Sequence, residues 1–352
     1  MKAVRVEQPG AQPYVVNDVP VPKPGEGQIL VKSVFTAINP VDAIMAQTGA
    51  MVPSFPFSPG CDAGGVVIKS GPKAINAMGR EWGAGDRVFG CTRLGTPGHS
   101  AWGEYFLMEA RVAVPVPPNL SLEQAGGMGV GLLTAAEGVF SCLGLPLPTD
   151  TASSATHAGN DKSWALVLGG ASSVGFHAVQ LLLACGLRVV STCAQRSSAL
   201  LEELGVRHVS YARPEQEIID EVARITDSRV RYVFDAVGSN NGLMPRLVAA
   251  VCGEKEVRIT TTNAFEPLPL IEGTIANTIQ LGSIGQPGPE ATELNDAITK
   301  YISVLYALMK SGKVKAGPYQ IAGEGIEGIL TAWEVQKSGK VAGKVVVKIA
   351  DE

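Results

Sequence analysis

The sequence predicts an α/β protein with two domains, one rich in short strands and one built on a doubly wound parallel sheet. The chain has 352 residues, more than one hydrophobic core usually supports. Residues 1–121 alternate short apolar runs with Pro and Gly turns, whereas from residue 164 onward strands alternate with helices. At 164–175 the sequence WALVLGGASSVG is typical of a strand buried on both faces that ends in a glycine turn.

The first domain is expected to take both ends of the chain, 1–121 and 290–352, around a second domain at 122–289. The pattern changes at a capping box, in which Ser121 is followed three residues later by Gln124. In the first domain we expect strands near 1–7, 14–19, 28–36, 58–69, 85–90, 101–108, 319 and 344–349, and helices near 37–45, 290–310 and 324–337.

The second domain is expected to hold six strands joined by right-handed crossovers. The strands are predicted near 164–170, 187–193, 207–211, 230–237, 255–262 and 278–285, and the helices near 130–143, 174–185, 197–204, 215–226 and 242–252. Ahead of the first of these strands, residues 144–162 are rich in Pro, Ser, Thr and Asn, which indicates an exposed insertion.

Composition narrows the class of protein. The net charge of −4 argues against broad binding to nucleic acid or to an anionic membrane surface. Six scattered cysteines without a CxxC pair indicate reduced thiols rather than a disulfide framework. The N-terminal sequence MKAVRVEQPG is not typical of a signal peptide, and no apolar run reaches about 18 residues. We therefore expect a cytoplasmic protein.

The glycine turn after the first strand of the second domain predicts a phosphate-binding corner. Its spacing is Gly169-x-x-Ser172-x-x-Gly175, and a helix-forming segment follows. Free N–H groups at the start of such a helix bind the pyrophosphate of a dinucleotide. Ser172 replaces one glycine of the usual fingerprint but can still donate its hydroxyl. The alternative is an ordinary tight turn between a strand and a helix.

The end of the next strand predicts which dinucleotide is bound. An NAD site usually has Asp or Glu there, to bind the ribose 2′-hydroxyl. Residues 194–198 read AQRSS and contain no acid, whereas Arg196 and the serines could hold a 2′-phosphate. Two charge-assisted hydrogen bonds of about 1.5–3 kcal/mol each would decide for NADP(H), since about 1.4 kcal/mol is tenfold in affinity. The alternative is a solvated polar loop.

Taken together, the motifs resemble the medium-chain dehydrogenase/reductase superfamily, in which an inserted Rossmann domain divides a GroES-like domain. The matching stretches are AINPVD at 37–42, PGCDAGGVV at 59–67, GDRV at 85–88 and AGKVVV at 342–347. Zinc-dependent members carry Cys in the first stretch and His-Glu in the second, where this chain has Asn39-Pro40 and Cys61-Asp62. Because catalytic zinc needs three protein ligands, we interpret the protein as zinc-free, with no metal site.

Three stretches narrow the resemblance to one branch. AINPVD looks like the zinc-free quinone and enoyl reductases, while LGLPLP at 143–148 and STCAQRSS at 191–198 resemble fungal trans-acting enoyl reductases of the lovastatin-pathway type. This resemblance implies a monomer that uses NADPH to reduce the α,β-double bond of an acyl thioester. The thioester would be carried by a polyketide synthase or a synthase–peptide synthetase hybrid.

The resemblance also implies the residues of the site. The catalytic candidates are Thr134 and Asp42, although for Asp42 the role of a structural hydrogen-bond acceptor is favoured, and Thr134 could instead bond back within its helix. Some relatives carry Lys where this chain has Ile44, so no single side chain is predicted as the proton donor. The implied cofactor-binding residues are Val41, Asp42, Ala43, Ile44, Thr134, Ser172, Ser173, Val174, Gly175, Ala194, Gln195, Arg196, Ser197, Tyr211, Thr262, Asn263, Leu281, Gly282, Ser283, Ile284, Ala342 and Gly343.

Two other functions stay open on the sequence alone, because one fold hosts many activities. The chain could be a quinone or small-enone reductase, or it could be a non-catalytic structural protein that binds NADPH. All three hypotheses predict NADPH binding, and only the first predicts saturation of acyl thioesters.

Overall fold

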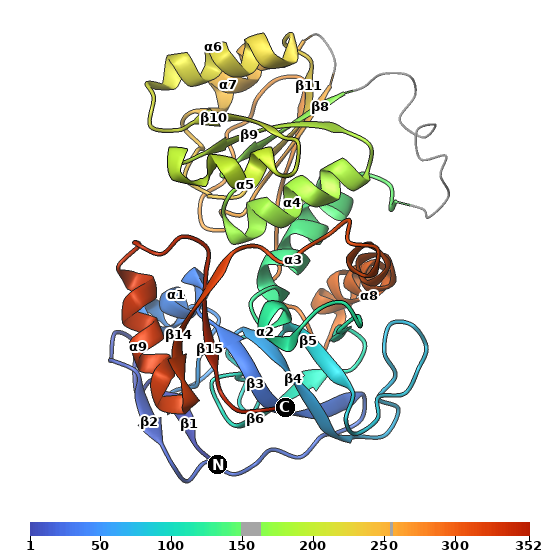
Figure 1. Cartoon of the computed structure of the whole chain (residues 1–352), viewed down its shortest axis with the longest axis vertical. Helices are drawn as coiled ribbons and strands as arrows, with labels where there is room; N and C mark the ends of the chain where they lie inside the picture. Colours follow the sequence, from blue (N-terminus) through green and yellow to red (C-terminus); the bar gives the residue numbers. More distant parts are fainter. Residues whose placement is uncertain (149–162, 254–255) are drawn as a thin grey trace. The chain divides into compact units, whose positions relative to one another are not determined.

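The computed structural model describes residues 1–148, 163–253 and 256–352 (Figure 1). Its internal contacts divide the chain into two compact units, Met1–Leu133 with Leu281–Glu352 and Thr134–Gln280. The boundaries expected near 121 and 290 therefore fall inside the first unit. Helix α2 (Leu122–Ala125) belongs to that unit because it packs on strands of the first sheet. Most of the predicted insertion, from 149 to 162, lies outside the described residues.

The first unit is built on a mixed sheet, which is antiparallel except that β14 and β15, from the C-terminal tail, pair in parallel. Its strand order is β14-β15-β3-β4-β5-β7, with β6 also paired to β3. The strands are β3 (Gln28–Ala37), β4 (Asp62–Ser70), β5 (Arg87–Cys91), β6 (Tyr105–Glu109), β7 (Val114–Pro115), β14 (Tyr319–Glu324) and β15 (Lys344–Lys348). The pairing of Val346 with Ala37 joins the tail to a strand far away in the sequence.

The remaining elements of the first unit surround this sheet. A separate hairpin joins β1 (Ala3–Arg5) to β2 (Tyr14–Val16), and the helices are α1 (Pro40–Thr48), α8 (Pro289–Lys310) and α9 (Gly325–Lys337). One apolar core of the unit includes Ile29, Trp82 and Phe106, all nearly free of solvent. Pro40 suits the first position of α1, where its missing N–H would have no partner in the helix.

The second unit is a parallel sheet of six strands in the order β10-β9-β8-β11-β12-β13. The strands are β8 (Trp164–Leu168), β9 (Arg188–Cys193), β10 (Arg207–Ser210), β11 (Val230–Asp235), β12 (Val257–Thr261) and β13 (Thr274–Thr278). The helices include α4 (Ser173–Ala184), α5 (Ser198–Glu202), α6 (Glu215–Thr226) and α7 (Met244–Val251). The chain order reverses between β8 and β11, which is the switch point of a doubly wound dinucleotide-binding sheet. The predicted fold class is confirmed.

Two elements differ from their predicted form. The last strand of the second sheet is β13, not a strand at 278–285. Its register with β12 pairs Val257 with Thr274 and Thr261 with Thr278, after which turns containing Gly282 and Gly285 replace the expected strand. The helix predicted at 130–143 is α3 (Gly129–Ala136) followed by a π-helical segment, η1 (Glu137–Cys142). Within the described part of the chain, no helix combines the length and the apolar character needed to cross a membrane.

Candidate functional site

The glycine turn of the second unit begins where β8 ends. All five residues of β8 are buried, and Gly169 follows with a φ of +80°, a conformation that glycine adopts without strain. Hydroxyl groups of β9 fix the turn. Gly169 N donates to Thr192 Oγ1 over 2.9 Å, and Gly170 N donates to Ser191 Oγ over 3.0 Å. The turn is thus held by the strand that carries the next part of the site.

The glycines of this turn have no room for a side chain. A Cβ atom on Gly175 would lie 2.2 Å from the carbonyl oxygen of Gly169, and one on Gly170 would lie 2.1 Å from Ser191 Oγ. Helix α4 therefore approaches the strand as closely as the third glycine of a dinucleotide fingerprint permits. This close packing of helix against strand is what the predicted phosphate-binding corner requires.

Ser172 takes the N-cap position of α4. Its hydroxyl oxygen accepts the N–H of Gly175 over 3.0 Å, which leaves the hydroxyl hydrogen free to be donated. The N–H groups of Ser173 and Val174 have no acceptor within the helix, as in the first turn of any α-helix. These donors at the positive end of a helix dipole suit a pyrophosphate.

The loop after β9 runs through a 3₁₀ turn over Gln195–Ser197. Arg196 is exposed, and no ion pair joins its guanidinium to a carboxylate in the described ranges. Tyr211 lies beside this loop because its N–H donates to the carbonyl oxygen of Cys193 over 3.2 Å, and its side chain is 56% exposed. The loop thus offers a free cation and a neighbouring aromatic ring at the carboxyl edge of the sheet.

Asp235, at the end of β11, is a residue that the sequence analysis missed. Its buried carboxylate accepts the N–H groups of Val237 and Gly238, each over 3.1 Å, and the side-chain amide of Asn240 over 2.8 Å. It thereby fixes the loop that follows β11. An acid at the end of a buried strand, in the stretch FDAVG, was the available signal.

The same loop holds the end of β12 in place. Thr262 N donates to the carbonyl oxygen of Asp235 over 3.0 Å, and Asn263 Nδ2 donates to that of Gly238 over 2.8 Å. Among the predicted residues of the second unit, four groups follow the carboxyl ends of parallel strands and so share one edge of the sheet. They are Ser172–Gly175, Ala194–Ser197, Tyr211 and Thr262–Asn263.

Thr134 lies on α3 and its side chain is mostly buried. Its hydroxyl makes no hydrogen bond to any residue in the described ranges, so the alternative, a bond back to its own helix, is not formed. The π-helical segment η1 begins three residues later. Cys142 O, near the end of that segment, accepts the side-chain amide of Asn277 on β13 over 2.9 Å. The sheet edge thus stabilises a helix geometry that is uncommon in isolation.

In the first unit, Asp42 is wholly buried near the start of α1. One carboxylate oxygen accepts Asn39 N over 2.8 Å, and the other accepts Gly60 N over 3.0 Å and Cys61 N over 3.2 Å. Burial raises the pKa of Asp42 above its ordinary value, and its hydrogen bonds to Cys61, Asn39 and Gly60 offset part of this effect. This geometry is that of a structural acceptor, the second of the two predicted roles.

Asp62 and Lys344 form a buried ion pair close to Asp42. Their Oδ2 and Nζ atoms are 2.7 Å apart, and the side chains are 0% and 10% exposed. Asn39 bridges the pair, since its amide nitrogen donates to Asp62 over 3.0 Å and its amide oxygen accepts from Lys344. Val130 N, at the start of α3, donates to the second oxygen of Asp62 over 2.6 Å. Lys344 lies in the stretch AGKVVV, which by itself does not indicate this contact.

The segment Leu281–Ile284, predicted as part of a strand, is a turn. Ile284 N donates to Leu281 O over 3.0 Å, and Gly285 N donates to Asn295 Oδ1 on α8 over 2.7 Å. Gln286 then bonds to Thr96 Oγ1 over 3.1 Å. The turn is thus attached to the loop that follows β5.

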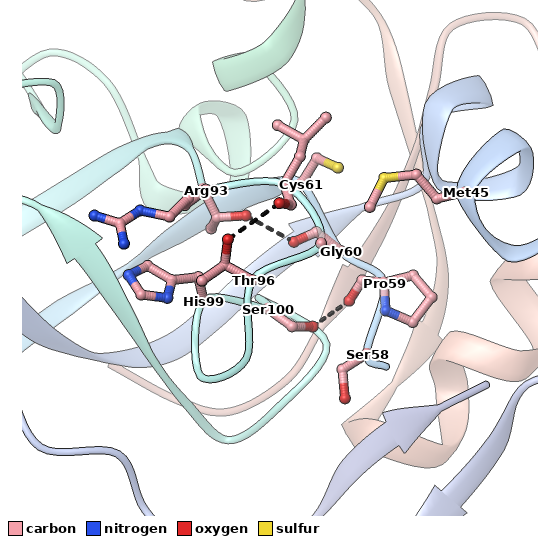
Figure 2. Close-up of a pocket in the computed structure, with 12 residues that line it drawn as sticks. Met45, Ser58, Pro59, Gly60, Cys61, Arg93, Thr96, His99 and Ser100 are labelled. Carbon is pink, nitrogen blue, oxygen red and sulfur yellow. Dashed lines mark hydrogen bonds between the residues drawn. The ribbon is translucent and has the colours of Figure 1, made fainter. Parts of the chain in front are cut away.

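A small pocket of the first unit lies against that loop (Figure 2). It is lined by Met45 of α1, by residues 58–61 and 92–96, and by His99 and Ser100. Figure 2 shows Met45 on the opposite side of the pocket from Arg93 and His99. Thr92 Oγ1 donates to Gly60 O over 3.1 Å, and Ser100 Oγ donates to Pro59 O. The pocket therefore adjoins both the backbone that binds Asp42 and the loop that binds Gln286.

The positions where zinc-dependent relatives carry His-Glu are occupied by Cys61 and Asp62. Burial, followed by the charge of Asp42, raises the pKa of the Cys61 thiol well above its usual range. Both oxygens of Asp62 already accept the hydrogen bonds given above. In residues 1–148, 163–253 and 256–352, no three His, Cys, Asp or Glu side chains gather in a way that could hold a metal ion.

Comparison with known proteins first shows which fold the chain resembles. Residues 25–118 match the family model of the alcohol dehydrogenase GroES-like domain. The fold is that of an alcohol dehydrogenase superfamily protein from Novosphingobium aromaticivorans, with a TM-score of 0.80, 22% identity and coverage of 99% of this chain and 100% of that one. The chain thus has the predicted architecture, in which a second unit with a doubly wound sheet interrupts a GroES-like domain.

The sequence is similar, more particularly, to fungal trans-enoyl reductases. It is 28% identical to trans-enoyl reductase FSL5 of Gibberella zeae over 347 residues, which cover 95% of this chain and 92% of that protein. It is 28% identical to trans-enoyl reductase ACTTS2 of Alternaria alternata over 343 residues, which cover 95% of each chain. The resemblance predicted from short motifs is confirmed along nearly the whole sequence, and it supports an oxidoreductase.

Proposed function

We propose that this chain is a trans-acting enoyl reductase, which uses NADPH to reduce the α,β-double bond of an acyl thioester carried by a polyketide synthase. The observation that carries this proposal is the similarity to trans-enoyl reductases over 95% of the chain. The partner would be a polyketide synthase or a synthase–peptide synthetase hybrid, and the enzyme would act in the cytoplasm as a monomer.

The residues present fit a phosphorylated dinucleotide. The closely packed glycines give a cradle that a Cβ would fill, and Ser172, Ser173 and Val174 supply donors for the pyrophosphate. Arg196 and Ser197, with no acid at the strand end, would bind the 2′-phosphate. Tyr211, exposed beside this loop, would pack near the adenosine.

The residues proposed for the nicotinamide end come from several elements. They are Val41–Ile44 on α1, Thr134 on α3, Thr262 and Asn263 after β12, the turn Leu281–Ile284, and Ala342 and Gly343 before β15. When bound, NADPH supplies the hydride for the β-carbon of the substrate. The contribution of the chain is to hold, orient and shield the reacting groups.

Thr134 is the side chain that we propose as a hydrogen-bond donor to the thioester oxygen or to the cofactor. Its hydroxyl is not used within the helix, which supports this role. One such donor is typically worth about 2.7–4 kcal/mol in the transition state. We propose that Asp42 acts indirectly, because its carboxylate accepts three backbone N–H groups and so fixes the start of α1.

The test is to mix the purified protein with NADPH and the crotonyl or a methyl-branched enoyl thioester of pantetheine. The proposal predicts that the absorbance of the reduced nicotinamide falls as the thioester becomes saturated. Oxidation of NADPH by quinones without thioester activity would instead favour a quinone reductase. Tight NADPH binding without either activity would favour a non-catalytic protein.

A further inference from the structure

Among Lys and Arg ion pairs in the described residues, the pair between Asp62 and Lys344 is the most deeply buried, with exposed fractions of 0% and 10% against 13% and 17% for Arg93 and Glu109. Most of the other pairs are largely exposed. An ion pair at such depth adds little to stability by itself, because removing two charges from water is costly. It persists where further hydrogen bonds complete it, and here Asn39 bonds to both partners. The three side chains form a closed triangle.

This triangle joins the starts of four elements of the first unit. Asn39 precedes α1, Asp62 begins β4, Lys344 begins β15, and Val130 lies in the first turn of α3. The negative charge of Asp62 near the start of α3 also suits the helix dipole. A single carboxylate therefore fixes the relative positions of three other elements.

Backbone contacts around Lys344 leave it little freedom. Lys344 N donates to Pro318 O over 2.9 Å, and Ile38 N donates to Val345 O over 3.0 Å. Gly343 has a φ of +97°, and a Cβ there would lie 2.3 Å from Pro318 O. These contacts thus fix the main chain of Lys344, and its ammonium group contacts Asn39 and Asp62.

We propose that Lys344 is a positioning residue for hydride transfer, which acts by fixing α1 and the residues before β15 through Asn39 and Asp62. This inference rests on the proposed function. Val41 to Ile44 follow Asn39 within one turn of helix, and Ala342 and Gly343 directly precede Lys344. Both are segments that we assign to the nicotinamide end. Small displacements of such supporting elements can reduce a rate by about 10²-fold.

The test uses Lys344→Met and Lys344→Arg, with Lys348→Met as the matched control. Lys348 lies on the same strand and pairs with Asp351 over 2.7 Å, but both side chains are exposed. We expect Lys344→Met to lower kcat at least about tenfold and to raise the primary isotope effect with 4-deuterated NADPH, as hydride transfer becomes slower. Lys344→Arg should retain most of the rate, and Lys348→Met should match the wild type.

A double variant, Asp62→Asn with Lys344→Met, separates positioning from stability. Without either charge, no unpaired ion stays buried, so the thermal midpoint should recover most of what Lys344→Met loses. The rate and the isotope effect should stay altered, while the affinity for 2′,5′-ADP, which probes only the adenine end, should not change. The fluorescence of bound NADPH should also differ from that of the wild type, with no substrate present.

The proposal is overturned if the double variant recovers the wild-type rate together with its thermal midpoint. It is also overturned if Lys344→Met behaves as Lys348→Met does. If the wild type itself fails to reduce enoyl thioesters, the proposed function is wrong. In that case NADPH fluorescence still decides whether Lys344 positions the nicotinamide.

Discussion

At the scale of single residues, the proposed choice of NADPH over NADH rests on Arg196. It stands at the end of β9, where an NAD-binding protein usually has a carboxylate, and the described residues give it no ion-pair partner. A free guanidinium is the group that binds phosphate through paired hydrogen bonds. The proposed preference for NADPH therefore depends on one exposed side chain and the serine beside it.

Arg196→Glu should reverse or abolish the preference for NADPH over NADH. The change removes charge-assisted bonds of about 1.5–3 kcal/mol each and adds repulsion, so NADPH should bind about 100-fold more weakly. Arg207→Glu is the control, because Arg207 begins β10 at the opposite edge of the sheet. Titration of both cofactors measures the effect, and equal affinities in the wild type would contradict this assignment.

Residues were predictable from sequence where their role depends on neighbours in the chain. Ser172 caps the helix that it begins, and Gly175 lies in the turn that it shapes. Lys344 escaped prediction because its partners, Asn39 and Asp62, lie far away in the sequence. Nothing in AGKVVV shows that its lysine meets Asp62, a contact that arises only when β15 joins β3 in the same sheet.

At the scale of elements, the turn between β8 and α4 is the part most closely determined by its sequence. It depends on glycine at positions where other residues would collide with backbone or with Ser191. By contrast, the prediction of a strand at 278–285 was wrong. It relied on apolar residues whose pattern is typical of a strand. The register with β12 ends the strand at Thr278, and this pairing is not visible in a local pattern. Gly282 and Gly285 then lie in turns.

Gly175→Ala should weaken NADPH binding severely, because the new methyl group would lie 2.2 Å from a backbone oxygen that cannot move aside easily. Helix α4 would have to shift, and its N–H donors with it. Gly242→Ala is the matched control in the same unit, since a Cβ there meets no atom within 4 Å. Fluorescence titration with NADPH tests this, and equal affinities for both variants would contradict the proposed cradle.

At the scale of the whole molecule, all six cysteines are free thiols, and burial raises the pKa of each one. The pKa of Cys142 is raised to about 11, and those of Cys185 and Cys252 to about 12. A thiolate is the reactive form, so folding protects these groups at neutral pH.

Alkylation of the native protein at pH 8 should therefore be slow. A thiol of ordinary pKa is about one quarter ionised there, whereas one with a pKa of 11 is about one thousandth ionised. The rate should rise as the pH climbs toward 11, because each raised pKa delays the appearance of thiolate. Mass spectrometry after timed labelling measures this, with guanidinium-unfolded protein as the control. Rapid labelling of the native state at pH 8 would contradict the burial described here.

The most direct test of the central claim follows a labelled hydride into product. The protein is incubated with 4-deuterated NADPH and an enoyl thioester attached to an acyl carrier protein, and the product is analysed by mass spectrometry and NMR. We predict a saturated thioester with deuterium at its β-carbon, formed much more slowly with NADH. A thioester that stays unsaturated while the protein holds NADPH would contradict the account.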